Sequence, residues 1–342
     1  MTQSVVGHPE GKKDVPVDQL MKHIGTEFPW QSKYIEIHGH QMRYIDEGEG
    51  DPIVFIHGNP TSAYLWRNVI PWLENSGRVV AFDMIGMGES DKPDIEYSME
   101  FMASTIDELF EKLELKNMTL VVHDWGGALG FHYARRFPEN VKGIAFMEAN
   151  VPPAIPAPSF EDLGEETGAQ FKFIHSEAGK EAMLEGNFFI EHNFRGKIVR
   201  NLTDREMQVW RDYYPTPASR RSGLDMARDT PMGVSEGFAF ENISAYAKWM
   251  QETDTPFLML WGQPGIIINE DVAQFLVENC KDIEAHMFGH GLHYVQEDHP
   301  EEIGRAIQDW MRRRGFESGP NVSRAFNAPK RKVENALAHA SE

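Results

Sequence analysis

The chain has 342 residues, of which 41% are hydrophobic and 25% charged; these proportions are ordinary for a globular protein and sufficient for a full-size core. Acidic residues outnumber basic ones by 53 to 33, for a formal charge of -20. Because no basic stripe accompanies this charge, nucleic acid is excluded as a partner. The single cysteine, Cys280, excludes an internal disulfide.

The sequence shows neither a targeting segment nor a membrane-spanning segment. Residues 1–14 lack an apolar stretch of signal-peptide length. No apolar run reaches the length of about 18 residues that a transmembrane helix needs. We therefore predict a cytoplasmic protein with no membrane partner, and we expect a monomer or a weak homodimer.

The first part of the chain predicts strands that alternate with helices. After an N-terminal segment at 1–33, two stretches with alternating polarity predict strands joined by a turn at Gly39. Continuous apolar runs then follow, which are typical of strands buried on both faces of a parallel sheet. The predicted strands are 34–37, 42–45, 53–56, 79–82, 120–122 and 144–147, and helical spacing predicts helices at 99–113 and 126–137.

The pattern changes after Glu148. Residues 150–230 begin with a proline-rich stretch and contain helix-like pieces with many aromatic residues but no strand run. Strands are predicted again at 257–260 and 283–288, and a helix at 300–314. The fold class is therefore α/β, with a mostly parallel, doubly wound sheet and a helical cap insertion. We expect the core at 34–149 and 231–316, the cap at 150–230, and a loosely ordered tail at 317–342.

A strand-to-helix corner carries the main candidate residue. In the stretch 121–127 an apolar strand ends, one residue turns sharply, and two glycines open a helix. This is the layout of the nucleophile elbow G-x-S-x-G, with Asp124 in the serine position and Val122 in place of the first glycine. Alternatively, Asp124 caps the following helix. The chain order of Asp124, an acid and then His293 is that of nucleophile, acid and base in hydrolases and favours a catalytic role.

His293 and Glu148 are the candidate partners of Asp124. His293 lies in a glycine-rich loop after a predicted strand, where a general base fits, although His290 is an alternative. Glu148 ends the strand at 144–147, and a carboxylate there can orient and stabilise the charged imidazole. The stretch 261–265, after the next strand, contains no acid. His123, beside the elbow, is interpreted as structural.

Asn59 and Trp125 are candidate donors near Asp124. Asn59 follows the first parallel strand, and its backbone N–H together with that of Trp125 is expected to form an oxyanion hole. The Asn amide and the indole N–H are also neutral side-chain donors, which suit a departing halide. Taken singly, Asn59 could be a turn residue and Trp125 a packing residue; side by side near Asp124 they favour a functional site.

At these motifs the chain resembles the haloalkane dehalogenases of the α/β-hydrolase fold. The shared pieces are 57–62, 65–67, 83–90, 123–127, 147–148 and 291–298. The acid at Glu148 is similar to that of the second subfamily, which also contains luciferases. The resemblance implies that Asp124 is the nucleophile, His293 the base and Glu148 the acid, with Asn59 and Trp125 as halide clamp. It also implies that no metal and no organic cofactor is needed.

One departure from the family concerns the insertion. Relatives usually carry an aromatic residue followed by proline beside the halide pocket, whereas this chain has Met226-Ala227. A wider or more flexible pocket is therefore expected. Its candidate lining residues are Phe160, Phe188 and Leu292.

The resemblance implies a small halogenated hydrocarbon and a halide ion as partners, with hydrolysis through an alkyl ester of Asp124. An epoxide hydrolase is an alternative, but it normally uses a pair of cap tyrosines, and Tyr213 and Tyr214 are adjacent in the chain. A luciferase-like monooxygenase shares the same motifs. A ligand receptor on a hydrolase scaffold is a further alternative, because fold alone does not fix function.

Overall fold

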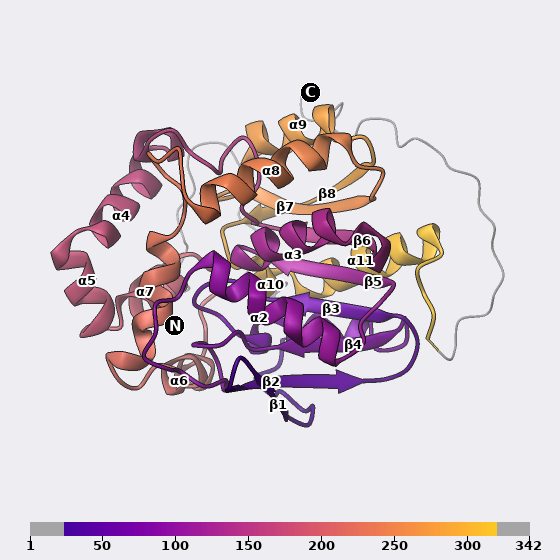
Figure 1. The fold of residues 1–342 in the computed structure, drawn as a ribbon, viewed down its shortest axis with the longest axis horizontal. Coiled ribbons are helices and arrows are strands. Elements are labelled where there is room, and N and C mark those ends of the chain that lie inside the picture. Colours follow the sequence, from indigo (N-terminus) through magenta and orange to yellow (C-terminus); the bar gives the residue numbers. More distant parts are fainter. Residues whose placement is uncertain (1–23, 320–342) are drawn as a thin grey trace, which may run out of the picture.

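The computed structural model describes residues 24–319, and its centre is an eight-stranded sheet with the order β1-β2-β4-β3-β5-β6-β7-β8 (Figure 1). The strands are β1 Lys33–Ile37, β2 His40–Glu47, β3 Pro52–Ile56, β4 Arg78–Phe82, β5 Met118–His123, β6 Val141–Met147, β7 Phe257–Pro264 and β8 Ile283–Gly291. Strand β2 is antiparallel to both neighbours, and the other pairings are parallel. The predicted mostly parallel sheet is confirmed. Of the tail predicted at 317–342, the part beyond Gly319 lies outside the described residues.

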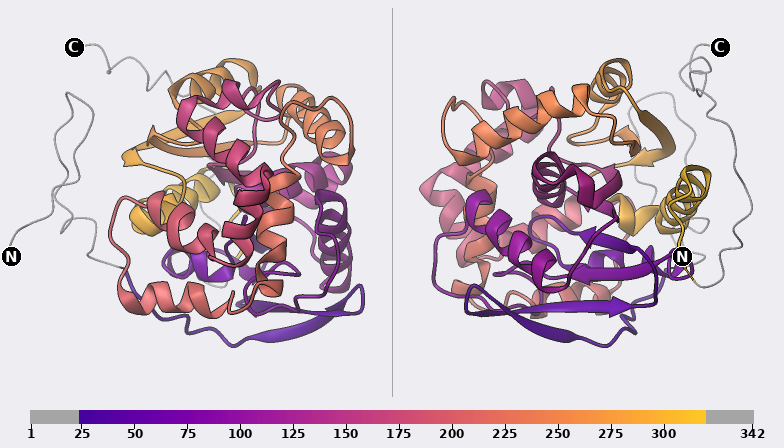
Figure 2. Two further views of the ribbon diagram at one scale, coloured as in Figure 1. Left: turned by 90° about the vertical axis from the view of Figure 1, so that its left-hand side faces the viewer. Right: turned by 45° about the vertical axis from the view of Figure 1, so that its right-hand side comes forward.

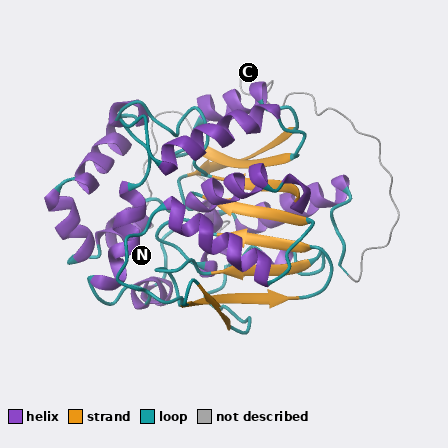
Figure 3. Cartoon of the chain, in the orientation of Figure 1, coloured by secondary structure: helices purple, strands orange, loops and turns teal. Residues whose placement is uncertain are grey.

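Helices cover both faces of the sheet (Figure 3). On one face lie α2 Met99–Lys112, α3 Trp125–Arg136, α8 Phe238–Glu252 and α9 Glu270–Asn279, and on the other lies α11 Pro300–Arg314. Strand β3 shows why its sequence is continuously apolar. Val54 and Ile56 pack toward the first face, whereas Ile53 and Phe55 pack toward the second, and all are fully buried. A strand with two buried faces cannot alternate in polarity.

The helical insertion lies beyond the carboxyl ends of the parallel strands, where it covers one end of the sheet (Figure 1; Figure 2, left). It contains α4 Glu165–His175, α5 Glu177–Leu184, the π-helix η5 Phe189–Phe194, α6 Asp204–Asp212 and α7 Arg221–Arg228. Helix α6 begins with a capping box, in which Thr203 and Glu206 satisfy each other's backbone N–H groups. The insertion therefore forms a lid of short helices over the site end of the sheet. Within residues 24–319, no helix combines the length and hydrophobicity needed to cross a membrane.

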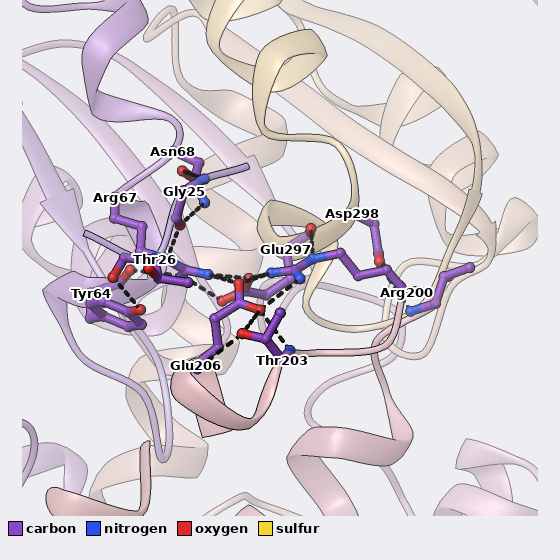
Figure 4. A network of polar contacts seen from close by, with 11 residues as sticks. Gly25, Thr26, Tyr64, Arg67, Asn68, Arg200, Thr203, Glu206, Glu297 and Asp298 are labelled. Atoms are coloured by element: carbon purple, nitrogen blue, oxygen red, sulfur yellow. Dashed lines mark hydrogen bonds and ion pairs between the residues drawn. The ribbon is translucent and has the colours of Figure 1, made fainter. Parts of the chain in front are cut away.

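Four buried charges join the insertion to the core, and we call them the charge cluster (Figure 4). Arg67 donates to both carboxylate oxygens of Glu297 at 2.7 Å and to Glu206 at 2.8 Å. Arg200 donates to Glu206 at 2.6 Å and to Glu297 at 2.5 Å. Charges this deeply buried persist only when they are paired. Because Glu297 belongs to α10 Val295–Asp298, the charge cluster anchors the chain directly after His293.

Candidate active site

Asp124 occupies a strained corner between β5 and α3. Its backbone has φ 52° and ψ −123°, a conformation that is uncommon for any residue other than glycine and typical of functional sites. Its side chain makes no capping hydrogen bond to α3, so the helix-capping alternative does not hold. Gly126 allows the close approach, because a Cβ there would lie 2.2 Å from the carbonyl oxygen of Ile56.

The Asp124 carboxylate is held between the N–H of Asn59 and the imidazole of His293. Oδ1 accepts a hydrogen bond from the Asn59 N–H at 2.7 Å, and Oδ2 lies 3.5 Å from His293 Nε2. The residue is only 9% exposed. Burial alone would raise the pKa of Asp124, but His293 and the Asn59 N–H outweigh it and hold the pKa below its usual value. Asp124 is thus a buried, ionised carboxylate.

His293 bridges two carboxylates. Its Nδ1 lies 3.1 Å from Oε2 of Glu148, on the side opposite Asp124. Burial acts to lower the pKa of His293, but the two carboxylates outweigh it and raise the pKa above its usual value. His123 contacts the carbonyl oxygen of His293 through Nε2 at 2.9 Å, and burial foremost lowers the pKa of His123 to about 3. A neutral, buried His123 is consistent with its interpretation as structural.

Glu148 is held by a loop that the sequence reasoning missed. It is fully buried, and its carboxylate accepts hydrogen bonds from the backbone N–H groups of Ile266, Ile267 and Ile268 at 3.1, 2.9 and 3.2 Å. These residues follow β7 and come directly after the acid-free stretch 261–265. The available signal was Gly265, which has φ 66° and where a Cβ would lie 2.2 Å from the Ile268 carbonyl oxygen. The loop supplies backbone donors to the acid instead of an acid of its own.

Asn59 and Trp125 lie beside Asp124, as predicted, and they line the same cavity. Asn59 Nδ2 donates to the Gly223 carbonyl of α7 at 2.8 Å. An amide nitrogen has two hydrogens, so the other remains for a ligand. The Asn59 N–H contacts the Asp124 carboxylate, whereas among the described residues the Trp125 N–H makes no such bond. Asn59 and Trp125 thus both line the cavity that holds the Asp124 carboxylate.

The cavity above these residues has a volume of about 60 Å³, which is room for several water molecules. Apolar residues from the insertion form part of its wall: Ile155, Leu163, Phe171, Ile174, Phe189 and Ala227. The other lining residues include the polar side chains of Asn150, Thr167, Gln170, Asn193, Lys197 and Thr230. Sequence reasoning did not identify these polar residues. Within residues 24–319, no group of three His, Cys, Asp or Glu side chains is placed to hold a metal.

The predicted lining residues Phe160, Phe188 and Leu292 are not among those that line the cavity. The Phe188 ring packs against Phe173 and His192, and the Phe160 ring packs against His175. Phe189 takes the expected place of Phe188, because one step along a helical segment turns the side chain by roughly 100°.

Met226 and Ala227, the two residues that depart from the family pattern, lie in two different environments. Ala227 lines the cavity, whereas Met226 is fully buried in the main hydrophobic core. Of these two residues, only Ala227 therefore contributes directly to the cavity.

The chain is similar to haloalkane dehalogenases over most of its length. The family model for the alpha/beta hydrolase fold matches residues 51–300. A haloalkane dehalogenase from Sphingobium indicum is 40% identical over 296 residues, which cover 85% of this chain and 98% of the relative. One from Mycolicibacterium smegmatis is 36% identical over 307 residues, covering 88% and 96%. The crystal structure of the haloalkane dehalogenase DbeA from Bradyrhizobium elkani matches with a TM-score of 0.79 at 33% identity, covering 84% of this chain and 98% of that one. The chain therefore belongs to the haloalkane dehalogenase family of the α/β-hydrolase fold.

Proposed function

We propose that this chain hydrolyses haloalkanes to an alcohol, a halide ion and a proton through a covalent ester on Asp124. One observation carries the proposal. A buried carboxylate has one oxygen held by a backbone N–H and the other 3.5 Å from an imidazole, in a cavity that two neutral side-chain donors also line. The names of the relatives support the same reaction class.

In the first step, Asp124 Oδ2 attacks the halogen-bearing carbon from the side opposite the halogen. The C–O ester bond forms while the carbon–halogen bond breaks, and the halide leaves with the electron pair. The free amide hydrogen of Asn59 and the indole N–H of Trp125 stabilise the developing charge. A well-placed donor of this kind lowers a barrier by about 3 kcal/mol.

In the second step, neutral His293 takes a proton from a water molecule that attacks the ester carbonyl carbon of Asp124. The backbone N–H groups of Asn59 and Trp125 are the proposed oxyanion hole. Glu148 stabilises the imidazolium that forms. The alkyl–oxygen group leaves as the alcohol with a proton from His293, and the Asp124 carboxylate is restored.

The tyrosines favour this reaction over epoxide opening. Tyr213 and Tyr214 do not line the cavity, and the Tyr214 hydroxyl donates to the Pro60 carbonyl at 2.8 Å. Among the described lining residues the only tyrosine is Tyr294, whose hydroxyl donates to the Asn59 carbonyl at 3.4 Å. Within residues 24–319, no phenol is therefore arranged as a proton donor for an epoxide oxygen.

Halide release from 1-bromobutane and 1,2-dibromoethane tests the proposal. The wild-type chain should release bromide, and Asp124→Ala should release none above the blank. Styrene oxide and coelenterazine, assayed in parallel, test the two rival activities. Unchanged turnover in Asp124→Ala would remove the nucleophile from the proposal.

A trapped ester gives a second, independent test. His293→Phe should form the alkyl ester without hydrolysing it, so that the intact mass of the protein rises by one alkyl group. His290→Phe is the matched control and should turn over without accumulating an adduct. An adduct that persists in the double variant Asp124→Ala/His293→Phe would place the ester on another residue.

A further inference from the structure

Lys197 places an ionisable amino group in the cavity, although a simple haloalkane offers no charged group for it to bind. It lies in the segment between η5 and α6, is partly buried and lines the cavity with Asp124 and His293. Its backbone carbonyl accepts the Tyr294 N–H at 3.2 Å, which fixes the start of its side chain beside the histidine loop. Within the described part of the chain, its ammonium group has no hydrogen-bond or ion-pair partner. A cation withdrawn from water without a partner is costly.

Asn150 also lines this cavity, and its side chain carries a second donor without a described partner. It lies two residues after Glu148 and is 2% exposed. Its backbone carbonyl accepts the Tyr246 hydroxyl, but its amide nitrogen Nδ2 has no partner among the described residues. Leaving a buried donor unpaired is unfavourable. Two side-chain donors that line one cavity, Lys197 and Asn150, thus lack partners among the described residues.

These donors are additional to those that serve the halide. Asn59 and Trp125 flank Asp124, whereas Lys197 and Asn150 remain for another part of a bound molecule. A pocket for a plain alkyl chain is lined mainly by apolar groups, and its few polar groups mark where a ligand is oriented. We propose that Lys197 and Asn150 form a second subsite for a carboxylate at the end of the substrate remote from the halogen. The preferred substrates are then ω-halogenated carboxylates; this inference rests on the proposed dehalogenation.

The electrostatics of Lys197 agree with an anionic ligand. Burial lowers the pKa of Lys197, while the carboxylates of Glu148, Asp124 and Glu166 act to raise it. A substrate carboxylate at the ammonium would offset the cost of burial through a charge-assisted hydrogen bond. A neutral ether or carbonyl oxygen would offset less of it.

The reaction balances without a co-reactant. The carbon–bromine bond breaks as the Asp124 oxygen bonds to the same carbon, and bromide leaves with the electron pair. Water supplies a hydroxyl to the Asp124 acyl carbon and a proton to His293. That proton passes to the alkyl oxygen as the ω-hydroxycarboxylate leaves, and the remaining acidic proton goes to solvent. The substrate carboxylate is unchanged throughout.

The test compares 6-bromohexanoate with its methyl ester and with 1-bromohexane by bromide release, each corrected for release without enzyme. The wild type should show the highest kcat/KM on 6-bromohexanoate. Lys197→Met should lower that value about tenfold or more, because the substrate carboxylate loses a charge-assisted hydrogen bond, and should change the value for 1-bromohexane much less. Lys180→Met removes an exposed lysine of the insertion and should change none of the three values.

Binding without turnover separates this inference from the proposed function. Calorimetry should show that hexanoate binds the wild type. Its affinity should be lower for Asn150→Leu and lowest for Lys197→Met. If no substrate releases bromide, the proposed dehalogenation fails, while hexanoate binding still decides the subsite. Three results would overturn the subsite. The first is an equal kcat/KM of the wild type for the three substrates, and the second is an equal loss on all three in Lys197→Met. The third is hexanoate binding that Lys197→Met does not weaken.

Discussion

At the residue scale, the charge on Asp124 controls the basicity of His293. The two carboxylates raise the pKa of His293 in the free enzyme, against the effect of burial. Formation of the ester removes the Asp124 charge and with it one of these two contributions. The pKa of His293 should therefore fall just when the imidazole must be neutral to act as a base.

The first prediction follows from this change. The rate of ester hydrolysis should fall as the pH falls and His293 becomes protonated, and this acid limb should lie at a lower pH than the titration of His293 in the free protein. Single-turnover hydrolysis across pH gives the first value, and an NMR titration of the imidazole gives the second. Asp124→Ala should shift the NMR titration downward in the same way. Two coincident values would show that the Asp124 charge does not act on His293.

The second prediction concerns Glu148→Gln. The substitution removes the charge that stabilises the imidazolium and places an NH₂ group near the N–H donors of residues 266–268. Steady-state turnover should fall by roughly 10⁴-fold, as for loss of the orienting acid in Ser-His-Asp hydrolases. The initial burst of halide should persist, because ester formation does not need the base. Glu302→Gln, which alters an exposed partner of His286, should retain wild-type turnover.

At the element scale, the elements with the strongest local signal were predicted closely. The helix predicted at 300–314 has the same bounds in the structure, and that predicted at 99–113 ends one residue earlier. Strands β7 and β8 extend several residues beyond their apolar runs, to Pro264 and Gly291. The two extensions pair with each other, as at Gln263 with His290 and Pro264 with Gly291, and hydrophobic periodicity carries no information about such pairing.

The juxtaposition of Asp124, Glu148 and His293 was predictable from sequence, because the elbow and the chain order constrain the three residues jointly. The loop that holds Glu148 was not, since backbone donors leave no residue-type signature apart from the glycine at 265. Lys197 was also missed. It looks like a surface residue in a polar stretch, and only the folded insertion places it in the cavity.

A third prediction concerns the charge cluster, which connects the insertion to α10. Arg67→Met should destabilise the protein by about 3–5 kcal/mol, because it leaves Glu297 and Glu206 buried with one cation fewer. Urea unfolding measures the change. Arg205→Met is the matched control: its ion pair with Glu27 is 68% and 70% exposed, and such a pair contributes about 0–1 kcal/mol. Equal losses in both variants would contradict the role given to burial.

Within the same cluster, Glu206 predicts how stability depends on pH. Burial alone would raise the pKa of Glu206, but Arg200, the Thr203 N–H and Arg67 outweigh it and lower the pKa from 4.5 to about 2. A lowered carboxyl pKa adds stability that is complete above the unfolded value and is lost as the pH falls from 4.5 toward 2. Unfolding free energies of the wild type and Glu206→Gln should therefore converge as the pH falls through this window. A constant difference would contradict the shifted pKa.

At the scale of the whole molecule, the formal charge of -20 should make the fold sensitive to salt. Like charges repel in the compact state, and the screening length shortens from about 30 Å at 0.01 M salt to about 8 Å at 0.15 M. We expect the Tm, measured by calorimetry, to rise by a few degrees between about 0.01 M and about 0.15 M sodium chloride, the concentrations to which these screening lengths apply.

Chloride could also stabilise the fold by binding at the proposed halide site, which would mimic screening. Trp125→Phe separates the two effects, because it removes the indole donor and leaves the net charge unchanged. An equal rise in both proteins supports screening, whereas a rise confined to the wild type would assign the effect to bound halide.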